Sequence, residues 1–248
     1  MDESIRLEPI GYGKQIAVSD HHTFGTDAVL LSNFARAGRS DRMADIGTGC
    51  GIIPFLMLRD GLLSDAVGVD ISPEAVKLAD MGARENGFEN FRAVCSDLND
   101  LKGKVPFGAF DLVTCNPPYK ADGAGLKSED AVIRTARHET DCTLEDIVSV
   151  GARLLQTGGR LCMCHRPERA AELICLMSKH KAEPKRMRLV AQRKGKRPWL
   201  VLIEGKRSAK AGLIIEPTLY VEDESGNFSP EMIEIYGAYK EKYLNGSR

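Results

Sequence analysis

The chain has 248 residues, 43% of them hydrophobic, with a formal net charge of −1 and seven cysteines. The length allows one large α/β domain or two small ones. An odd, scattered set of cysteines excludes a disulfide framework and paired zinc ligands, so we expect reduced thiols in a cytoplasmic protein. No apolar run approaches the about 18 residues that a membrane helix needs, and His21 and His22 lack a third ligand at metal spacing. We therefore expect neither a membrane segment nor a metal.

Short apolar stretches that are typical of strands alternate with helical patterns along the first two thirds of the chain. The expected strands cover residues 43–47, 66–70, 91–97, 110–116 and 159–165. One helix is expected between the cap Ser72 and the stop Gly87, and another between the cap Thr143 and the stop Gly158. This alternation predicts βαβ units, hence a parallel sheet with helices on both faces.

The pattern changes after about residue 184. Three strand-like stretches follow without helices between them, at residues 186–192, 198–205 and 213–221, so we expect antiparallel pairs at one edge of the sheet. A final helix is expected after Ser229, with Pro230 at its first position. Because no internal repeat or linker is evident, we expect residues 1–248 to form a single domain.

Positive charge is concentrated in residues 176–215, which hold twelve Lys or Arg and two acids, for a net charge of +10. The rest of the chain carries −11. Such separation is a candidate footprint for a polyanion, although a solvated basic face would give the same pattern. The residues expected to contact substrate in this segment are Arg193, Lys194, Lys196 and Arg197.

A glycine-rich stretch, ADIGTGCGI at residues 44–52, follows the first expected strand. Gly47, Gly49 and Gly51 let the backbone turn tightly and approach a ligand at the next helix N-terminus. A dinucleotide fingerprint would need a glycine where Ile52 stands, and Asp45 would lie close to a pyrophosphate. Asp45 suits a ligand with positive charge. S-adenosylmethionine carries an ammonium, a sulfonium and a carboxylate, so we predict it as the cofactor.

Two further acids end the next two expected strands. Asp70 is placed to accept both ribose hydroxyls, and Asp97 could accept the adenine amino group. Either acid alone could be a simple cap or turn residue. Ile71 and Leu98, which follow them, are included among the expected cofactor contacts.

The stretch DLVTCNPPYK, residues 111–120, ends a strand with two prolines that cannot donate a backbone N–H. The side-chain oxygen of Asn116 and the carbonyl of Pro117 could both accept from an exocyclic amino group, which would turn its lone pair toward a methyl donor. Pro118 fixes the turn, and Tyr119 could stack on an unpaired base. The alternative is an ordinary turn at a strand end. These residues are the predicted catalytic group.

With these motifs the sequence resembles the class I S-adenosylmethionine-dependent methyltransferases, and among them the bacterial tRNA(Val) adenine-N(6) methyltransferase family. The segments FGTDAVLL, ADIGTGCGIIP, VGVDISPEAVKLA, FDLVTCNPPY and LYVEDESGNFSPEMIEIY carry the resemblance. It implies a Rossmann-like, seven-stranded, mostly parallel sheet and methylation of the adenine just 3′ of the anticodon of a valine tRNA. It also implies that Phe24, Gly25, Thr26 and Asp27 line the cofactor, although Thr26 or Asp27 could be a plain N-cap.

The remaining interpretations concern substrate and partners. Lys120 opens a long loop beside the expected pocket, and Arg137 could order it, so both are expected substrate contacts. Trp199 is expected to pack within a strand. A protein-glutamine methyltransferase and a non-catalytic RNA-binding protein stay open as alternatives, because fold resemblance does not decide function. The sequence does not determine the oligomeric state, but it favours a monomer.

Overall fold

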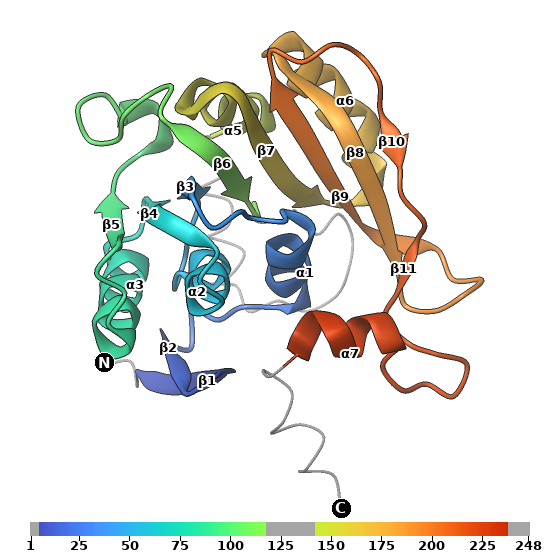
Figure 1. Cartoon of the computed structure of the whole chain (residues 1–248), viewed down its shortest axis with the longest axis horizontal. Helices are drawn as coiled ribbons and strands as arrows, with labels where there is room; N and C mark the ends of the chain where they lie inside the picture. The colour runs from blue at the N-terminus through green and yellow to red at the C-terminus, as the bar shows by residue number, and fades with distance from the viewer. Residues whose placement is uncertain (1–4, 118–141, 238–248) are drawn as a thin grey trace, which may run out of the picture.

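The computed structural model describes residues 5–117 and 142–237. Within these ranges, one nine-stranded sheet runs in the order β10-β8-β9-β7-β6-β3-β4-β5, and β11 also pairs with β8 (Figure 1). Its strands are β3 (Asp41–Ile46), β4 (Leu63–Asp70), β5 (Phe91–Cys95), β6 (Phe110–Cys115), β7 (Leu155–His165), β8 (Ala182–Ala191), β9 (Pro198–Arg207), β10 (Ile214–Ile215) and β11 (Leu219–Tyr220).

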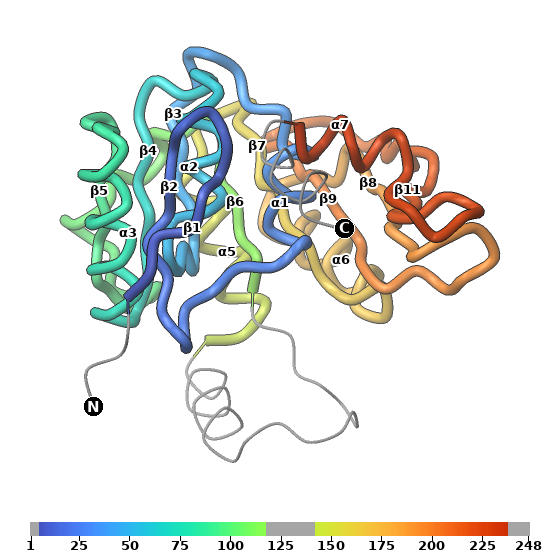
Figure 2. Tube along the Cα trace, turned by 90° about the horizontal axis from the view of Figure 1, so that it is seen from below, coloured from blue at the N-terminus to red at the C-terminus, as the bar shows by residue number. Residues whose placement is uncertain are grey.

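Helices cover both faces of the sheet. One face packs α1 (Thr26–Phe34), α2 (Ile52–Arg59) and α3 (Pro73–Asn86), and the other packs α5 (Leu144–Leu154) and α6 (Ala170–Lys179) (Figures 1 and 2). Two separate apolar cores result, one on each side of the sheet. Two 3₁₀ turns, η1 (Leu98–Asp100) and η2 (Pro167–Arg169), join the layers. None of the described helices is long and apolar enough to cross a membrane.

The strand directions confirm the predicted Rossmann-like fold. β5, β4, β3, β6 and β7 are mutually parallel, and β9 runs antiparallel to both β7 and β8. The described sheet has nine strands instead of the expected seven, and β10 and β11 have only two residues each. Because the chain passes from β3 outward through β4 to β5 and then returns to β6 on the other side of β3, the order reverses at β3. Such a switch point is where open α/β sheets bind ligands.

Local sequence signals place the ends of α3 and α7 (Pro230–Tyr236) as predicted. The Ser72 hydroxyl accepts from the Ala75 N–H at 3.3 Å, and Gly87 ends α3 in the left-handed region at φ 66°. Ser229 caps α7 by accepting from the Met232 N–H at 3.2 Å. In both helices a proline occupies the first turn, where its missing N–H costs nothing.

Two expectations were wrong: the end of helix α5, and the antiparallel direction of the stretch 213–221. Helix α5 keeps its predicted Thr143 cap but ends at Leu154, and Gly158, at φ 82°, lies inside β7. The pairing of β6 with β7 shifts register at this point, so the glycine serves a bulge instead of a helix end. The stretch 213–221 forms two short strands that pair with β8 in parallel. Pro217 separates them because it has no N–H for the ladder.

An N-terminal hairpin, β1 (Arg6–Gly11) and β2 (Lys14–Val18), was not predicted. Its second strand packs against α3, where the Asn86 side-chain oxygen accepts from the Gln15 N–H at 2.9 Å. The hairpin thereby closes the outer side of the core beneath α2 and α3. The hairpin is held by side-chain contacts between residues far apart in the sequence, such as Gln15 and Asn86, and the local sequence pattern does not predict such contacts.

Candidate active site

The predicted site residues gather at the carboxyl edge of the sheet. Strand β3 pairs with both β4 and β6, and Asp45 lies opposite Gly68 on one side and Thr114 on the other. The glycine loop, Asp70 and Asn116 follow the ends of these three adjacent strands. The structure therefore brings together residues that are more than 65 positions apart in the chain.

The glycine loop has the backbone that its sequence predicts. Gly47, Gly49 and Gly51 have φ values of 68°, 55° and 87°, in the left-handed region. A Cβ at Gly47 or Gly49 would meet no atom within 4 Å, so open space borders both positions. A Cβ at Gly51 would lie 2.9 Å from the Phe55 ring, so this glycine is also needed for packing beneath the N-terminus of α2.

Asp45 is held in the interior behind this loop. It is 1% exposed, and its Oδ1 accepts from the Thr114 hydroxyl at 2.5 Å. The pKa of Asp45 is raised to about 7, chiefly by burial and to a small extent by the charge of Asp70, while the nearby Thr114 and Thr48 hydroxyls oppose the rise. Among the described residues, Asp45 Oδ2 and Thr48 Oγ1 are the buried side-chain atoms without a hydrogen-bond partner.

These observations fit S-adenosylmethionine. An unpartnered buried carboxylate oxygen is costly in the free protein and would be stabilised by a cationic group. The space beside Gly47 and Gly49 admits a ligand close to the backbone, and the N-terminus of α2 favours an anionic group. Asp45 and the loop thus provide complementary partners for the ammonium and carboxylate of that cofactor.

Asp70 organises the same loop from the end of β4. Its Oδ2 accepts from the Gly49 N–H at 2.8 Å, and its Oδ1 accepts from the Ser72 N–H at 2.9 Å. Each carboxylate oxygen can accept more than one hydrogen bond, so these contacts are compatible with the predicted ribose contact. Ile71, next in the chain, is 44% exposed at this edge.

Asp97 and Leu98 lie after β5, and their observed contacts are with η1 and the core instead of the glycine loop. Asp97 caps η1, and its Oδ1 accepts from the Asn99 N–H at 2.7 Å, which is the cap role left open by the sequence. Leu98 packs on the core beneath α5 and lines a separate cavity described below. Their predicted contacts with the cofactor stay predictions.

Asn116 and Pro117 are the part of the predicted catalytic group that the structure describes. The Cys164 thiol, on the neighbouring strand β7, donates to the Asn116 side-chain oxygen with a sulfur–oxygen distance of 3.1 Å. The contact fixes the carboxamide at the end of β6. Pro118, Tyr119, Lys120 and Arg137 lie outside the described residues.

The segment from Phe24 to Asp27 begins helix α1. Neither Thr26 nor Asp27 is its N-cap, because Gly25 holds that position without a side-chain hydrogen bond. The Thr26 hydroxyl instead accepts from the Tyr236 hydroxyl of α7 at 3.0 Å. Phe24 is half-buried against the core under α1. The C-terminal helix therefore fixes the start of α1, and the cofactor contacts of residues 24–27 stay predictions.

Part of the basic segment is neutralised within the fold. Arg186 contacts Glu204 at 2.9 Å and Glu216 at 3.0 Å, and Arg188 forms a bidentate pair with Glu231 at 2.6 and 2.8 Å. These acids lie on β9 and on segments after it. Arg186 and Arg188 therefore hold β8 to neighbouring elements and offer little free charge.

The turn between β8 and β9, residues 192–197, differs from the strands that it joins. Arg193, Lys194, Lys196 and Arg197 are all exposed, and none forms an ion pair with the described residues. Because β9 is antiparallel to β7, this turn lies at the same edge of the sheet as Asn116. Trp199, just after the turn, belongs to β9 as expected, but its side chain is 38% exposed and so is not packed in the interior.

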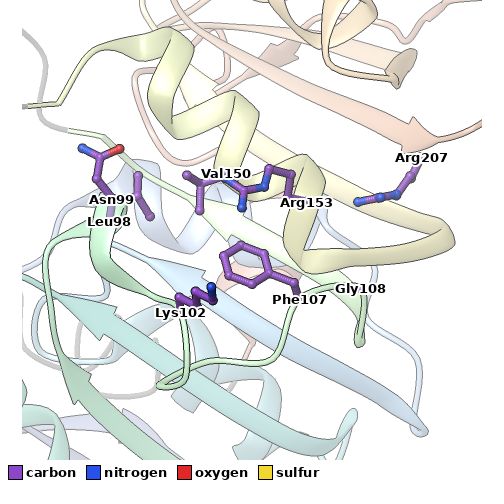
Figure 3. Close-up of a pocket in the computed structure, with 8 residues that line it drawn as sticks. All are labelled: Leu98, Asn99, Lys102, Phe107, Gly108, Val150, Arg153 and Arg207. Carbon is purple, nitrogen blue, oxygen red and sulfur yellow. The ribbon is translucent and has the colours of Figure 1, made fainter.

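A cavity of about 680 Å³ lies elsewhere, between the loop before β6 and the end of α5 (Figure 3). Cationic side chains line it, with Arg153 over the Phe107 ring at 4.5 Å, and the Gly108 N–H donates to the Arg153 carbonyl at 2.9 Å. Its lining comes from η1, the loop before β6, α5 and the last residue of β9, and does not include Asn116. Within the described ranges, no group of three His, Cys, Asp or Glu could hold a metal.

Sequence reasoning missed several residues that support the site. Thr114 and Cys164 hold Asp45 and Asn116, and Gly68 leaves room for the Thr48 side chain, which would lie 2.7 Å from a Cβ there. Only Thr114 had a usable signal, because it lies two residues before Asn116 and so faces the same side of the strand.

A family model described as "Methyltransferase domain" matches residues 38–207, more than half of the chain. The chain belongs to this methyltransferase family, which confirms the predicted enzyme class. A protein described as a predicted O-methyltransferase from Agrobacterium tumefaciens shares the fold, with a TM-score of 0.68 and 20% identity over 86% of this chain and 97% of that one. M. jannaschii TYW2 in complex with AdoMet gives a TM-score of 0.56 at 11% identity, over 83% of this chain and 87% of that one.

Two relatives carry a more specific name than the family model. A protein of Tolumonas auensis named tRNA1(Val) (adenine(37)-N6)-methyltransferase is 28% identical over 85% of this chain and 86% of its own length. A protein of the same name from Porphyromonas gingivalis is 28% identical over the same shares. The resemblance seen in the motifs therefore extends over most of both chains.

Proposed function

We propose that this protein transfers a methyl group from S-adenosylmethionine to the N6 amino group of an adenine in tRNA. The observation that carries the proposal is the grouping of Asp45, the glycine loop, Asp70 and Asn116 at the switch point of a methyltransferase fold. The names of the relatives support adenine in tRNA as the acceptor. The finer assignment is the adenine just 3′ of the anticodon in a valine tRNA.

In this proposal the chain binds the cofactor along the carboxyl edge. Asp45 faces its ammonium, the N-terminus of α2 its carboxylate, and Asp70 its ribose. When bound, the cofactor supplies an electrophilic methyl group on a sulfonium. Positioning and charge complementarity are then the main contributions of the protein to catalysis.

Asn116 and Pro117 orient the acceptor. A carboxamide oxygen and a backbone carbonyl that both accept from the exocyclic amine hold its hydrogens away from the methyl group. The Asn116 oxygen lies at the end of β6, one residue beyond the Cys115–Met163 pairing. Stacking by Tyr119, which lies outside the described residues, and substrate contacts by Lys120 and Arg137 belong to this proposal.

RNA is favoured over protein as substrate because of the β8–β9 turn. Its four exposed cations lie at the carboxyl edge of the sheet, close to Asn116 in the strand order, where phosphates of a bound RNA would neutralise them. A protein-glutamine substrate has no use for such a surface.

The test supplies the purified enzyme and isotopically labelled S-adenosylmethionine with total tRNA, DNA or a protein extract in separate reactions. We expect label in N6-methyladenosine after digestion of the tRNA to nucleosides, and about 10²–10³-fold slower labelling with Asn116→Ala. Valine tRNA transcripts with and without the adenine 3′ of the anticodon then test the position. Label in glutamine of the protein fraction alone would contradict the proposal.

A further inference from the structure

A fully buried thiol contacts the proposed catalytic amide. Cys164 is 0% exposed in β7, and its sulfur lies 3.1 Å from Asn116 Oδ1. Strand register explains the contact, because Cys115 pairs with Met163 and the next residue of each parallel strand lies beside the other. The contact therefore follows from the central sheet and does not depend on a loop.

The orientation of the Asn116 carboxamide decides what it can do. Its oxygen accepts hydrogen bonds and its nitrogen donates them, so a rotation of the amide by 180° would present a donor to an amine that needs an acceptor. A thiol hydrogen directed at the oxygen favours one of the two orientations. The oxygen can accept two hydrogen bonds, so contact with Cys164 is compatible with contact to the target amine.

We propose that Cys164 is a positioning residue, whose thiol holds the Asn116 carboxamide with its oxygen available for the amine acceptor. The inference rests on the proposed function, in which Asn116 accepts from that amine. Cys164 does not touch the substrate, and its effect on the reaction passes through Asn116.

The chain contains a matched control two residues earlier. Cys162 lies on the same strand and in the same apolar core, is also 0% exposed, and its sulfur lies 3.7 Å from Glu204 Oε2. Replacing either cysteine by alanine removes one buried sulfur atom. Only Cys164→Ala removes the hydrogen bond to Asn116.

Single-turnover rate, KM for tRNA, donor affinity and Tm are measured for Cys164→Ala, Cys164→Ser and Cys162→Ala. We expect Cys164→Ala to lower the rate about 3- to 10-fold, the effect of losing one neutral hydrogen bond, with KM and donor affinity unchanged. Cys164→Ser keeps a donor and should recover most of the rate. Cys162→Ala should match Cys164→Ala in Tm and match the wild type in rate. Equal rates for the two alanine variants would overturn the inference.

A second measurement separates this inference from the proposed function. The side-chain amide signals of Asn116, identified by their loss in Asn116→Ala, are followed by ¹H–¹⁵N NMR. We expect them to shift in Cys164→Ala and not in Cys162→Ala, whether or not tRNA is the substrate. Unshifted signals would overturn the inference even if tRNA methylation is found, and shifted signals without tRNA methylation would overturn only the proposed function.

Discussion

The carboxyl edge of the sheet and the cavity in Figure 3 are both open to a ligand, but they are built differently. At the carboxyl edge, three glycines have positive φ values, a buried carboxylate oxygen has no partner among the described residues, and Asp70 accepts two backbone N–H groups. The cavity is lined by Lys102, Arg153 and Arg207 together with apolar residues and Asn99, and has no acidic lining residue.

The comparison shows that the size of a cavity is a poor guide to chemistry. An unpartnered buried polar group destabilises the free protein, and it persists where a ligand compensates for it. Exposed Lys and Arg side chains around an aromatic ring need no such compensation. We therefore assign the chemistry to the carboxyl edge, and three of the predictions below pair a change there with one at the cavity or near it.

The largest effect is expected for Asn116→Ala. Loss of one preorganised contact to the reacting group typically lowers the rate about 10²–10³-fold, and donor affinity should persist because the side chain contacts the acceptor. Asn99→Ala, which removes the same side chain at the cavity, should leave the rate unchanged. Single-turnover kinetics and donor calorimetry check both variants. A stable Asn116→Ala protein with near wild-type methylation would contradict the catalytic role proposed for Asn116.

Asp70→Ala should weaken donor binding about 10- to 100-fold, because charged hydrogen bonds to the ribose and the loop are both lost. Its effect on Tm should be much smaller. Asp100, an exposed acid paired with Lys104 at 2.7 Å, is the control, and Asp100→Ala should bind the donor normally. Calorimetry measures both affinities. Unchanged affinity in Asp70→Ala would mean that the donor does not use this end of β4.

Donor affinity should rise with pH as Asp45 ionises. The pKa of Asp45 in the free protein is about 7, raised by burial, so the group is protonated below that pH and a cationic donor favours its ionised form. Affinity should fall about fivefold between pH 7 and pH 6, because the ionised fraction falls from about one half to about one eleventh, and Asp45→Asn should remove this dependence. Within the described part of the chain no acid lines the cavity, so a donor bound there would show no such slope.

The same shift predicts how the stability of the ligand-free protein depends on pH. Since the folded pKa of Asp45 lies above its ordinary value of 3.8, the folded state binds the extra proton. The Asp45 contribution to stability is therefore fully present below about pH 4 and is lost as pH rises to about 7. Denaturant unfolding of the wild type and Asp45→Asn across this range isolates the contribution. A difference between the two that does not change with pH would contradict the buried titration.

The smallest effect concerns the basic turn. The double change Arg193→Ala with Arg197→Ala should weaken tRNA binding about fivefold and lower the slope of log K against log salt by about 0.7–0.9 per lost phosphate contact. The matched change Lys102→Ala with Arg153→Ala, at the cavity, should leave the slope unchanged. Filter binding at several salt concentrations provides both numbers. A lower slope for Lys102→Ala with Arg153→Ala, and an unchanged slope for Arg193→Ala with Arg197→Ala, would mean that RNA binds at the cavity instead of the turn.

The basic segment shows where counting charges was insufficient. Its +10 charge is correct as composition. Arg186 and Arg188 nevertheless pair with Glu204, Glu216 and Glu231, two of which lie outside the segment. Ion pairs between distant residues form only once β8, β9 and the C-terminal segments are in place. The cations of the β8–β9 turn form no ion pair with the described residues and are the ones proposed to contact RNA. The sequence alone did not distinguish them from the paired cations of the strands.

What the sequence determined by itself is short-range. Ser72, Thr143 and Ser229 mark helix starts, and the glycines of residues 47–51 mark a left-handed loop, because these properties depend on a residue and its near neighbours. Alternating strands and helices predicted a parallel sheet with helices on both faces, because parallel neighbours need a crossover connection, whereas the order of the strands came from the structure.

Tertiary structure decided how distant residues meet. Asp45 and Thr114 become partners because β3 and β6 are adjacent, and Asn116 meets Cys164 because β6 and β7 share a register. The raised pKa of Asp45 likewise requires burial by segments from across the chain. Pairing distance and burial depend on the packing of the whole fold, and no local pattern of residues encodes them.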